Sequence, residues 1–150
     1  MWYHKVVQDL AAIPDFIEYY DKELLAAKAE TSIKGSVERS LAELPGITQW
    51  RFGQLQEIEA VLEYLNIQLR KIKQKHYKKY LEGYNRALTS RDAERYADAE
   101  DEVLDYEVLI NEVALTRNKY LAIMKGLDQK SFMIGHLTRL KLGGMEDFSL

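Results

Sequence analysis

The sequence predicts an all-α protein built around a long antiparallel helical hairpin with shorter flanking helices. Two observations lead to this class. Apolar residues recur at three- and four-residue spacing almost throughout the 150 residues, and only Pro14 and Pro45 interrupt them. No stretch alternates apolar and polar residues between turn signals, as a β-strand would. With 47% hydrophobic residues, the chain has enough apolar material for the core of one domain.

The N-terminal third is predicted to consist of short pieces. A short helix is expected around residues 6–10, and Pro14 suits the first turn of the next helix, where its missing N–H is not needed. The segments TSIKGS (31–36) and LPG (44–46) have the composition of turns and predict two breaks. We therefore expect residues 1–45 to form an N-terminal helical extension.

Residues 46–150 are predicted to form the hairpin and a C-terminal helix, within a single structural domain overall. The first long helix runs from about Gln49 to about Leu81 and ends where Gly83, Asn85 and residues 88–90 interrupt the pattern. Its apolar residues follow the a and d positions of a heptad repeat. They are Leu55, Ile58, Leu62, Leu65, Leu69, Ile72 and His76.

The second arm of the hairpin begins where Thr89 and Asp92 resemble a capping box. Its apolar stripe is Tyr96, Ala99, Val103, Tyr106, Ile110, Val113, Tyr120 and Met124. Gly126 is predicted to end this helix, and Asp128 to begin the next one, which stops at residues 143–144. The residues expected to face inward on that last helix are Phe132, Met133, Leu137 and Leu140.

The charge of the chain is distributed in blocks, although the net charge is only −3. Residues 70–80 (RKIKQKHYKKY) hold six basic and no acidic residues, and residues 81–107 hold nine acidic and three basic ones. Residues 1–69 carry 11 acids against 6 bases, and residues 108–150 carry 4 against 6. The net charge is therefore a poor guide to the partners of this chain.

The sequence indicates a soluble cytoplasmic protein. There is no cysteine, which excludes disulfides and thiolate chemistry and favours a reducing compartment. No apolar run approaches the roughly 20 residues that span a bilayer. The stretch MWYHKVVQDLAAIPDF lacks the layout of a signal peptide, because Asp9 interrupts its apolar segment.

The residues give little support to an enzyme. The three histidines, His4, His76 and His136, lie far apart on different predicted elements, with no nucleophile in a glycine-rich turn beside them. None has a glutamate three residues before it, so the Glu-x-x-His motif of di-iron bundles is absent. The acidic cluster at residues 98–105 lacks EF-hand spacing and is better explained as a solvated helix face. We expect no catalytic residue, metal or cofactor.

The basic block suits a nucleic acid. On a helix its charges lie along a rod at three- and four-residue steps, so several of them can contact successive phosphates. Tyrosines lie among the charges, and unpaired bases stack on aromatic rings, which favours single strands over duplexes. The predicted binding residues are Arg70, Lys71, Lys73, Lys75, Tyr77, Lys78, Lys79 and Tyr80, with Tyr84 nearby. A second strip is predicted at Lys130, Arg139 and Lys141, near Lys125.

Simpler explanations of the same residues remain open. If the hairpin folds back on itself, the basic block lies near the acidic segment SRDAERYADAEDE (90–102), and the two can neutralise each other. Tyrosines at helical spacing also pack in cores or interfaces. His76 falls on the heptad seam, where packing is its simpler role.

Lys75, Tyr80 and Gly83 of KHYKKYLEG stand at the end of the first long helix, at the spacing of a basic segment known from one protein family. Through this segment and the end of the chain, residues 50–145 resemble the UvsY-type recombination mediators of tailed bacteriophages. The segment MKGLDQKSFMIGHLTRLKLGG is similar in layout to the family's C-terminal helix. The matching residues there are Phe132, Ile134, His136, Arg139 and Gly143. Tyr77 stands where the family has an arginine, and the first 45 residues match no part of it.

The resemblance implies a non-enzymatic accessory factor of recombination. Such a protein binds single-stranded DNA, weakens the hold of the single-strand-binding protein, and helps to load a RecA-like recombinase. It also implies a ring-like homo-oligomer, in which several copies turn a weak phosphate contact into tight binding. In a phage protein the compartment would be the cytoplasm of the host cell.

Two alternative functions compete with this one. A non-catalytic helical oligomerisation or adaptor protein would use its charges only for solubility and internal pairing, and would not bind nucleic acid. A membrane-surface protein is a weaker alternative, because the apolar face is heptad-regular and lacks Trp and Phe near the basic block.

Overall fold

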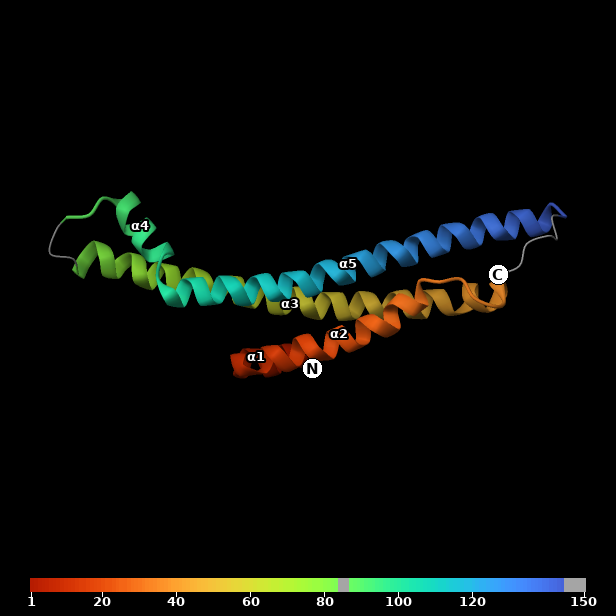
Figure 1. Ribbon diagram of the computed structural model, residues 1–150, viewed down its shortest axis with the longest axis horizontal. Coiled ribbons are helices and arrows are strands. Elements are labelled where there is room, and N and C mark those ends of the chain that lie inside the picture. Colours follow the sequence, from red (N-terminus) through yellow and green to blue (C-terminus); the bar gives the residue numbers. More distant parts are fainter. Residues whose placement is uncertain (84–86, 145–150) are drawn as a thin grey trace. The chain divides into compact units, whose positions relative to one another are not determined.

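The described protein is entirely α-helical, as the sequence predicts. The structure is a computed structural model that describes residues 1–83 and 87–144. Over these residues it contains five α-helices and one short 3-10 helix (Figure 1). They are α1 (Trp2–Gln8), η1 (Leu10–Ala12), α2 (Ile13–Glu30), α3 (Val37–Gly83), α4 (Ser90–Asp98) and α5 (Asp101–Leu142). Asn85 and Tyr84, named above as an interruption and as a neighbour of the basic block, lie outside the described residues.

The helices form two compact units. Unit 1 comprises Met1–Ile58 and Thr116–Leu150, and unit 2 comprises Glu59–Leu115. The long helices α3 and α5 contribute a segment to each unit, and these segments pack antiparallel as the predicted hairpin (Figure 1). No helix within the described ranges combines the length and the apolar character that crossing a bilayer requires.

The helix predicted at Pro14 forms as α2, which packs on α3 in unit 1. The short helix expected around residues 6–10 lies earlier, at Trp2–Gln8, and the N-terminal pieces end before Val37, where α3 begins. Pro14 is the second residue of α2, and Asp15 lies in the same first turn, where a negative charge favours the helix. The face of α2 at three- and four-residue steps is buried, through Phe16, Tyr20 and Leu24. The predicted loop follows, with Gly35 at a φ of 67°. This left-handed backbone turns the chain into α3 and suits a residue without a Cβ.

The predicted break at Leu44-Pro45-Gly46 is wrong, because α3 runs through it without interruption. A proline removes the hydrogen bond to the carbonyl four residues earlier, here that of Leu41. Both Leu41 and Pro45 lie on the exposed side of the helix, where water can bond to this carbonyl. On the other side Leu44 is buried. Burial of this face outweighs the local helix-breaking tendency.

The heptad seam of α3 is confirmed, and it is the main packing surface of the helix. Leu55, Ile58, Leu62 and Leu65 are buried, and His76 has only 8% of its surface exposed. Leu69 and Ile72 are partly buried. In unit 2 the seam meets the beginning of α5, where Nε2 of His76 lies 2.9 Å from Glu102.

The second predicted arm is divided into two helices. Thr89 caps α4 as predicted, because its side chain accepts a hydrogen bond from the Asp92 N–H at 3.2 Å. However, α4 ends at Asp98 and α5 begins at Asp101, so the apolar stripe is not continuous. Tyr96 and Ala99 are exposed, and the buried stripe of α5 starts at Val103.

The predicted end of a helix at Gly126 is also wrong. Helix α5 continues to Leu142, and the chain then turns at Gly143 and Gly144, as predicted. A Cβ on Gly126 would lie 3.0 Å from Cγ2 of Thr31, so this glycine allows the chain after α2 to approach α5 closely. Gly126 therefore serves the contact between α5 and the chain that follows α2, and it does not end the helix.

The inward face of the last part of α5 also differs from the prediction. Phe132 is 68% exposed, Met133 49% and Leu140 41%, and Leu137 is only partly buried. The buried residues are instead Ile123, Leu127, Lys130 and Ile134, which continue the stripe of an uninterrupted helix. The predicted face is wrong because a helix that restarts after Gly126 would turn a different set of side chains inward than the continuous helix α5 does.

Candidate functional site

The predicted basic block lies on the C-terminal part of α3, within unit 2. Its side chains point in different directions around the helix. Lys71, Lys75, Lys78 and Lys79 are exposed, while Lys73 is partly buried. The block therefore has an inner side, which meets the acidic segment, and an outer side, which does not.

Lys73 belongs to the inner side and is paired with two acids. Its Nζ lies 3.4 Å from Asp98 of α4 and 3.3 Å from Glu107 of α5. Burial lowers the pKa of Lys73, but the hydrogen bond to Glu107 and the attraction of Asp98 outweigh this effect and leave the pKa raised. Lys73 is thus charged and internally neutralised.

Glu100, in the junction between α4 and α5, gathers three more side chains of the block. It accepts a 2.5 Å hydrogen bond from the Tyr80 hydroxyl, and Lys79 lies 3.4 Å from the same oxygen. The Tyr80 bond is the main reason that the pKa of Glu100 is lowered, and Lys79 adds to it. Nδ1 of His76 lies 3.7 Å from Glu100, beyond hydrogen-bond distance, and Nε2 is 2.9 Å from Glu102.

The tyrosines of the block are only partly available to a ligand. Tyr80 is stacked on Tyr96 of α4, with ring centroids 5.3 Å apart and planes 29° apart. Tyr77 is half-buried and lines a cavity of about 540 Å³ between α3 and α4. Arg70, Lys73 and Gln74 line the same cavity, opposite Glu94 and Asp98. Of the two predicted stacking residues that are described, only Tyr77 lines this cavity.

The outer side of the block consists of Lys71, Lys75 and Lys78, which we call the lysine row. These residues are spaced by four and three positions, so they share one face of α3. All three are exposed, and none forms an ion pair with another residue in the described parts of the chain. The heptad seam lies on roughly the opposite side of the helix. The lysine row therefore presents three uncompensated positive charges to solvent.

The second predicted strip, near the end of α5 in unit 1, is not uniform. Arg139 and Lys141 are exposed. Lys130 is only 7% exposed, and its Nζ donates a 2.7 Å hydrogen bond to the carbonyl of Glu30, the last residue of α2. A cation is favoured at the C-terminus of a helix. Lys130 thus caps α2 and is not part of an exposed phosphate-binding strip.

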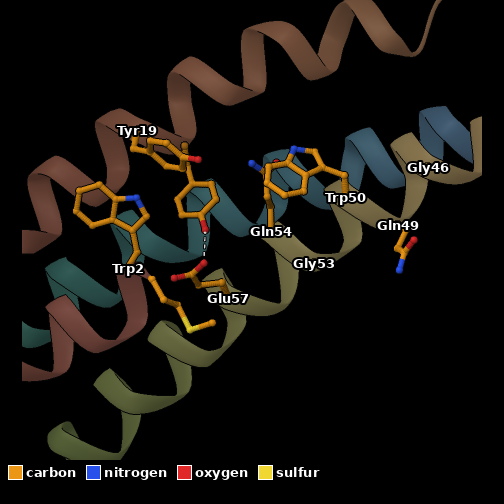
Figure 2. Close-up of a pocket in the computed structure, with 10 residues that line it drawn as sticks. Trp2, Tyr19, Gly46, Gln49, Trp50, Gly53, Gln54 and Glu57 are labelled. Carbon is orange, nitrogen blue, oxygen red and sulfur yellow. Dashed lines mark hydrogen bonds between the residues drawn. The ribbon is translucent and has the colours of Figure 1, made fainter. Parts of the chain in front are cut away.

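Sequence reasoning missed an aromatic groove in unit 1, with a volume of about 620 Å³ (Figure 2). Trp2 of α1 and Tyr19 of α2 stand on one side of it, and Trp50 of α3 on the other. Gly46 and Gly53 open its floor, because a Cβ at either position would meet nothing within 4 Å. Among the described residues that line the groove there is no Lys or Arg.

A polar cluster begins at Glu57, which lines the groove. Glu57 accepts a hydrogen bond from the Tyr20 hydroxyl at 3.0 Å (Figure 2), and another from the Tyr3 N–H at 2.8 Å. Arg51, only 3% exposed, donates hydrogen bonds to Glu23, Glu30 and Gln54. One signal in the sequence marks this region. Residues 44–56 contain a single charged residue, Arg51, together with the large aromatic residues Trp50 and Phe52.

The comparisons with known proteins add no identification. No family model, curated protein or solved structure matches this chain. Within the described residues, no group of three or more histidine or acidic side chains is arranged to hold a metal ion. The resemblance of residues 50–145 to phage recombination mediators therefore stays a prediction.

Proposed function

We propose that this protein binds single-stranded DNA through the lysine row of α3. The observation that carries the proposal is the division of the basic block. Lys73 and Lys79 are neutralised by acids of the same unit, while Lys71, Lys75 and Lys78 are exposed and unpaired in the described chain. Charges that are not needed for internal pairing, and that follow one face of a rod, suit a polyanion.

The surroundings of the lysine row combine an aromatic ring with basic and amide side chains, and this combination favours single-stranded over duplex DNA. Tyr77 borders the cavity between α3 and α4, where Arg70 and Gln74 also lie. A base that is not paired can enter such a cavity and stack on the ring, whereas a base in a duplex cannot. Three phosphate contacts alone give weak binding. Several copies on one strand would raise the effective concentration of the contacts.

The biological role that we propose is that of a recombination mediator. It rests on the resemblance at Lys75, Tyr80 and Gly83 and at the C-terminal end of α5. Such a homo-oligomer would bind single-stranded DNA, loosen a single-strand-binding protein and help to load a RecA-like recombinase. DNA binding is tested by itself, separately from the displacement of a single-strand-binding protein and the loading of a recombinase.

The test is the salt dependence of DNA binding, measured by fluorescence anisotropy. Replacing Lys71, Lys75 and Lys78 with alanine is expected to weaken binding of a labelled single strand. It should also reduce the slope of log K against log salt by about 2, since each phosphate contact to a single strand contributes about 0.7. A duplex of the same length is expected to bind more weakly than the single strand.

A matched control separates the effect of the lysine row on DNA binding from the effect of the protein's net charge. Lys22, Lys28 and Lys34 are exposed lysines of unit 1, and their replacement with alanine removes the same three charges. This control is expected to bind DNA almost as the unchanged protein does. Equal losses in both triple variants would show that only overall charge matters, and the proposal of a defined row would then be wrong.

One observation favours the alternative function, a helical adaptor protein that does not bind nucleic acid. Three acids of unit 2, Asp98, Glu100 and Glu107, lie against the basic block and neutralise Lys73 and Lys79 on its inner side. If the single strand does not bind even at low salt, the inner side of the block serves internal pairing and the lysine row serves solubility. The protein would then be a helical scaffold.

A further inference from the structure

The N-terminal part of α5 carries a second exposed surface in unit 2, made of apolar residues. Leu104 is 45% exposed, Val108 59% and Leu115 57%. They are spaced by four and seven residues, so they form one row along the helix. Asn111 lies in the same row, between Val108 and Leu115, and is exposed. The packed side of this helix segment, at Val103 and Val113, is roughly opposite.

An acidic row runs beside the apolar row. Asp101, Asp105 and Glu112 are exposed and have the same four- and seven-residue spacing, shifted by three positions. Glu107 lies on the other flank and is partly engaged by Lys73. The sequence contains no Lys, Arg or His between Arg95 and Arg117. The surface is therefore apolar along its centre and negative along its edges.

These two rows restrict what can cover the surface. A nucleic acid is excluded because the edges would repel its phosphates. The same face of a second copy is disfavoured, because the acidic edges of both copies would meet. A helix with an apolar row and flanking Lys or Arg residues satisfies both features, because its anchors pack on the centre while its charges pair with the edges.

We propose that this face of α5, at residues 101–115, docks a basic amphipathic helix of a partner protein. Leu104, Val108 and Leu115 are the apolar anchors, and the acidic row sets which side of the partner helix faces which edge. Asn111 is a polar position within an apolar seam, and such a position fixes the register of paired helices. This proposal does not depend on DNA binding, because the lysine row lies on α3.

The test uses a labelled synthetic peptide of Leu and Lys residues in a heptad pattern, with no nucleic acid present. We expect it to bind, and the counterpart with Glu in place of Lys not to bind. Val108→Gln should weaken binding about tenfold, which corresponds to about 1.4 kcal/mol, because Val108 is a central apolar anchor of the proposed interface. Asp105→Asn should weaken it and reduce its dependence on salt.

Leu25→Gln is the matched control for the apolar row. Leu25 is 70% exposed but lies on α2 in unit 1. This variant is expected to bind the peptide as the unchanged protein does. The helix content of each variant, measured by circular dichroism, should be unchanged, since the replaced side chains are exposed.

Two results would overturn the proposal. In the first, the peptide binds the Val108→Gln variant as tightly as the unchanged protein, so that charge alone accounts for binding. In the second, light scattering shows that the protein self-associates without peptide and that Val108→Gln abolishes this, so that the surface is covered by another copy. Neither result bears on the lysine row, whose DNA binding is measured with its own variants.

Discussion

Arg51 shows how single residues decide the packing of unit 1. Its guanidinium is nearly buried, and it donates two hydrogen bonds to Glu30, at 2.7 and 2.8 Å, and one to Glu23 at 2.9 Å. Hydrogen bonding from Gln54 and Arg51 holds the pKa of Glu23 below its usual value, against the opposing effect of burial. A buried charge is tolerated only when paired. Arg51 therefore links α3 to both the middle and the end of α2.

Tyr20 and Tyr120 belong to the same buried region and carry a prediction about pH. Burial raises the pKa of each hydroxyl well above 10, and for Tyr20 the nearby Glu57 carboxylate adds to this effect. Above pH 10 the unfolded chain loses these two protons while the folded protein keeps them. The free energy of unfolding should then fall by about 1.4 kcal/mol per pH unit for each tyrosine.

Urea unfolding at pH 8 and at higher pH, followed by circular dichroism, checks this expectation. The stability present below pH 10 should be lost as the pH rises. In Tyr20→Phe the loss should be smaller by about 1.4 kcal/mol per pH unit, because one ionising group is gone. The same alkaline loss in both proteins would mean that Tyr20 is not responsible.

At the scale of the element, the sequence predicts helices better than their ends. Thr89 and the pair Gly143–Gly144 mark ends correctly, because caps act locally through the backbone. Pro45 and Gly126 mislead, because their effects depend on what packs around them. Pro45 faces solvent, and Gly126 faces Thr31, which is 95 residues away in sequence. No local pattern contains that information.

For the candidate site, the sequence predicts where the charged segments lie but not which lysines are paired. The basic block is visible in the sequence, and so is the acidic segment that can neutralise it. Which lysines are neutralised depends on the direction of each side chain on α3 and on the position of Glu100 at the junction of α4 and α5. The break at that junction has no proline or glycine to mark it. Hence the lysine row could be separated from the rest only in the structure.

Gly126 provides a prediction for contact between α5 and the end of α2. Alanine is favoured over glycine within a helix by about 1 kcal/mol. In the unchanged protein the new Cβ of Gly126→Ala would press on Cγ2 of Thr31 at 3.0 Å, which opposes this gain. Thr31→Ser removes that methyl group but keeps the hydroxyl that donates to the Lys28 carbonyl.

The double-mutant cycle is therefore expected to show coupling. Gly126→Ala should stabilise the Thr31→Ser protein by about 1 kcal/mol and the unchanged protein by less, or not at all. Denaturant midpoints of the four proteins give the coupling free energy. Additive effects would show that the close approach at Thr31 does not explain the glycine.

At the scale of the whole molecule, the two units differ in what they bury. Unit 1 contains the large buried aromatic residues, Phe16, Tyr20 and Tyr120, together with the Arg51 cluster. In unit 2 the buried hydrophobic residues of the described chain are smaller: Val61, Leu62, Leu65, Ala93, Ala97, Val103 and Val113. Its surface instead carries opposite charges on different helices, which the net charge of −3 conceals.

This difference predicts unequal local stability. Regions with fewer buried apolar groups open more readily, so the amides of residues 61–82 and 90–115 should exchange with deuterium faster than those of 13–30 and 116–134. Mass spectrometry of peptides from the exchanged protein measures this. Single-stranded DNA is expected to slow exchange in residues 70–80 first. Uniform protection across both units would contradict the prediction.

The aromatic groove has a practical consequence for spectroscopy. The chain has only two tryptophans, and both of them, Trp2 and Trp50, line that groove in unit 1. Indole emission excited at the red edge of absorption, where tyrosine is dark, therefore reports on unit 1 alone. Tyrosine emission is not selective in this way, because Tyr20 and Tyr120 lie in unit 1 while Tyr77, Tyr80 and Tyr96 lie in unit 2. Tryptophan emission can thus follow the melting of unit 1 by itself in an unlabelled sample of the whole protein.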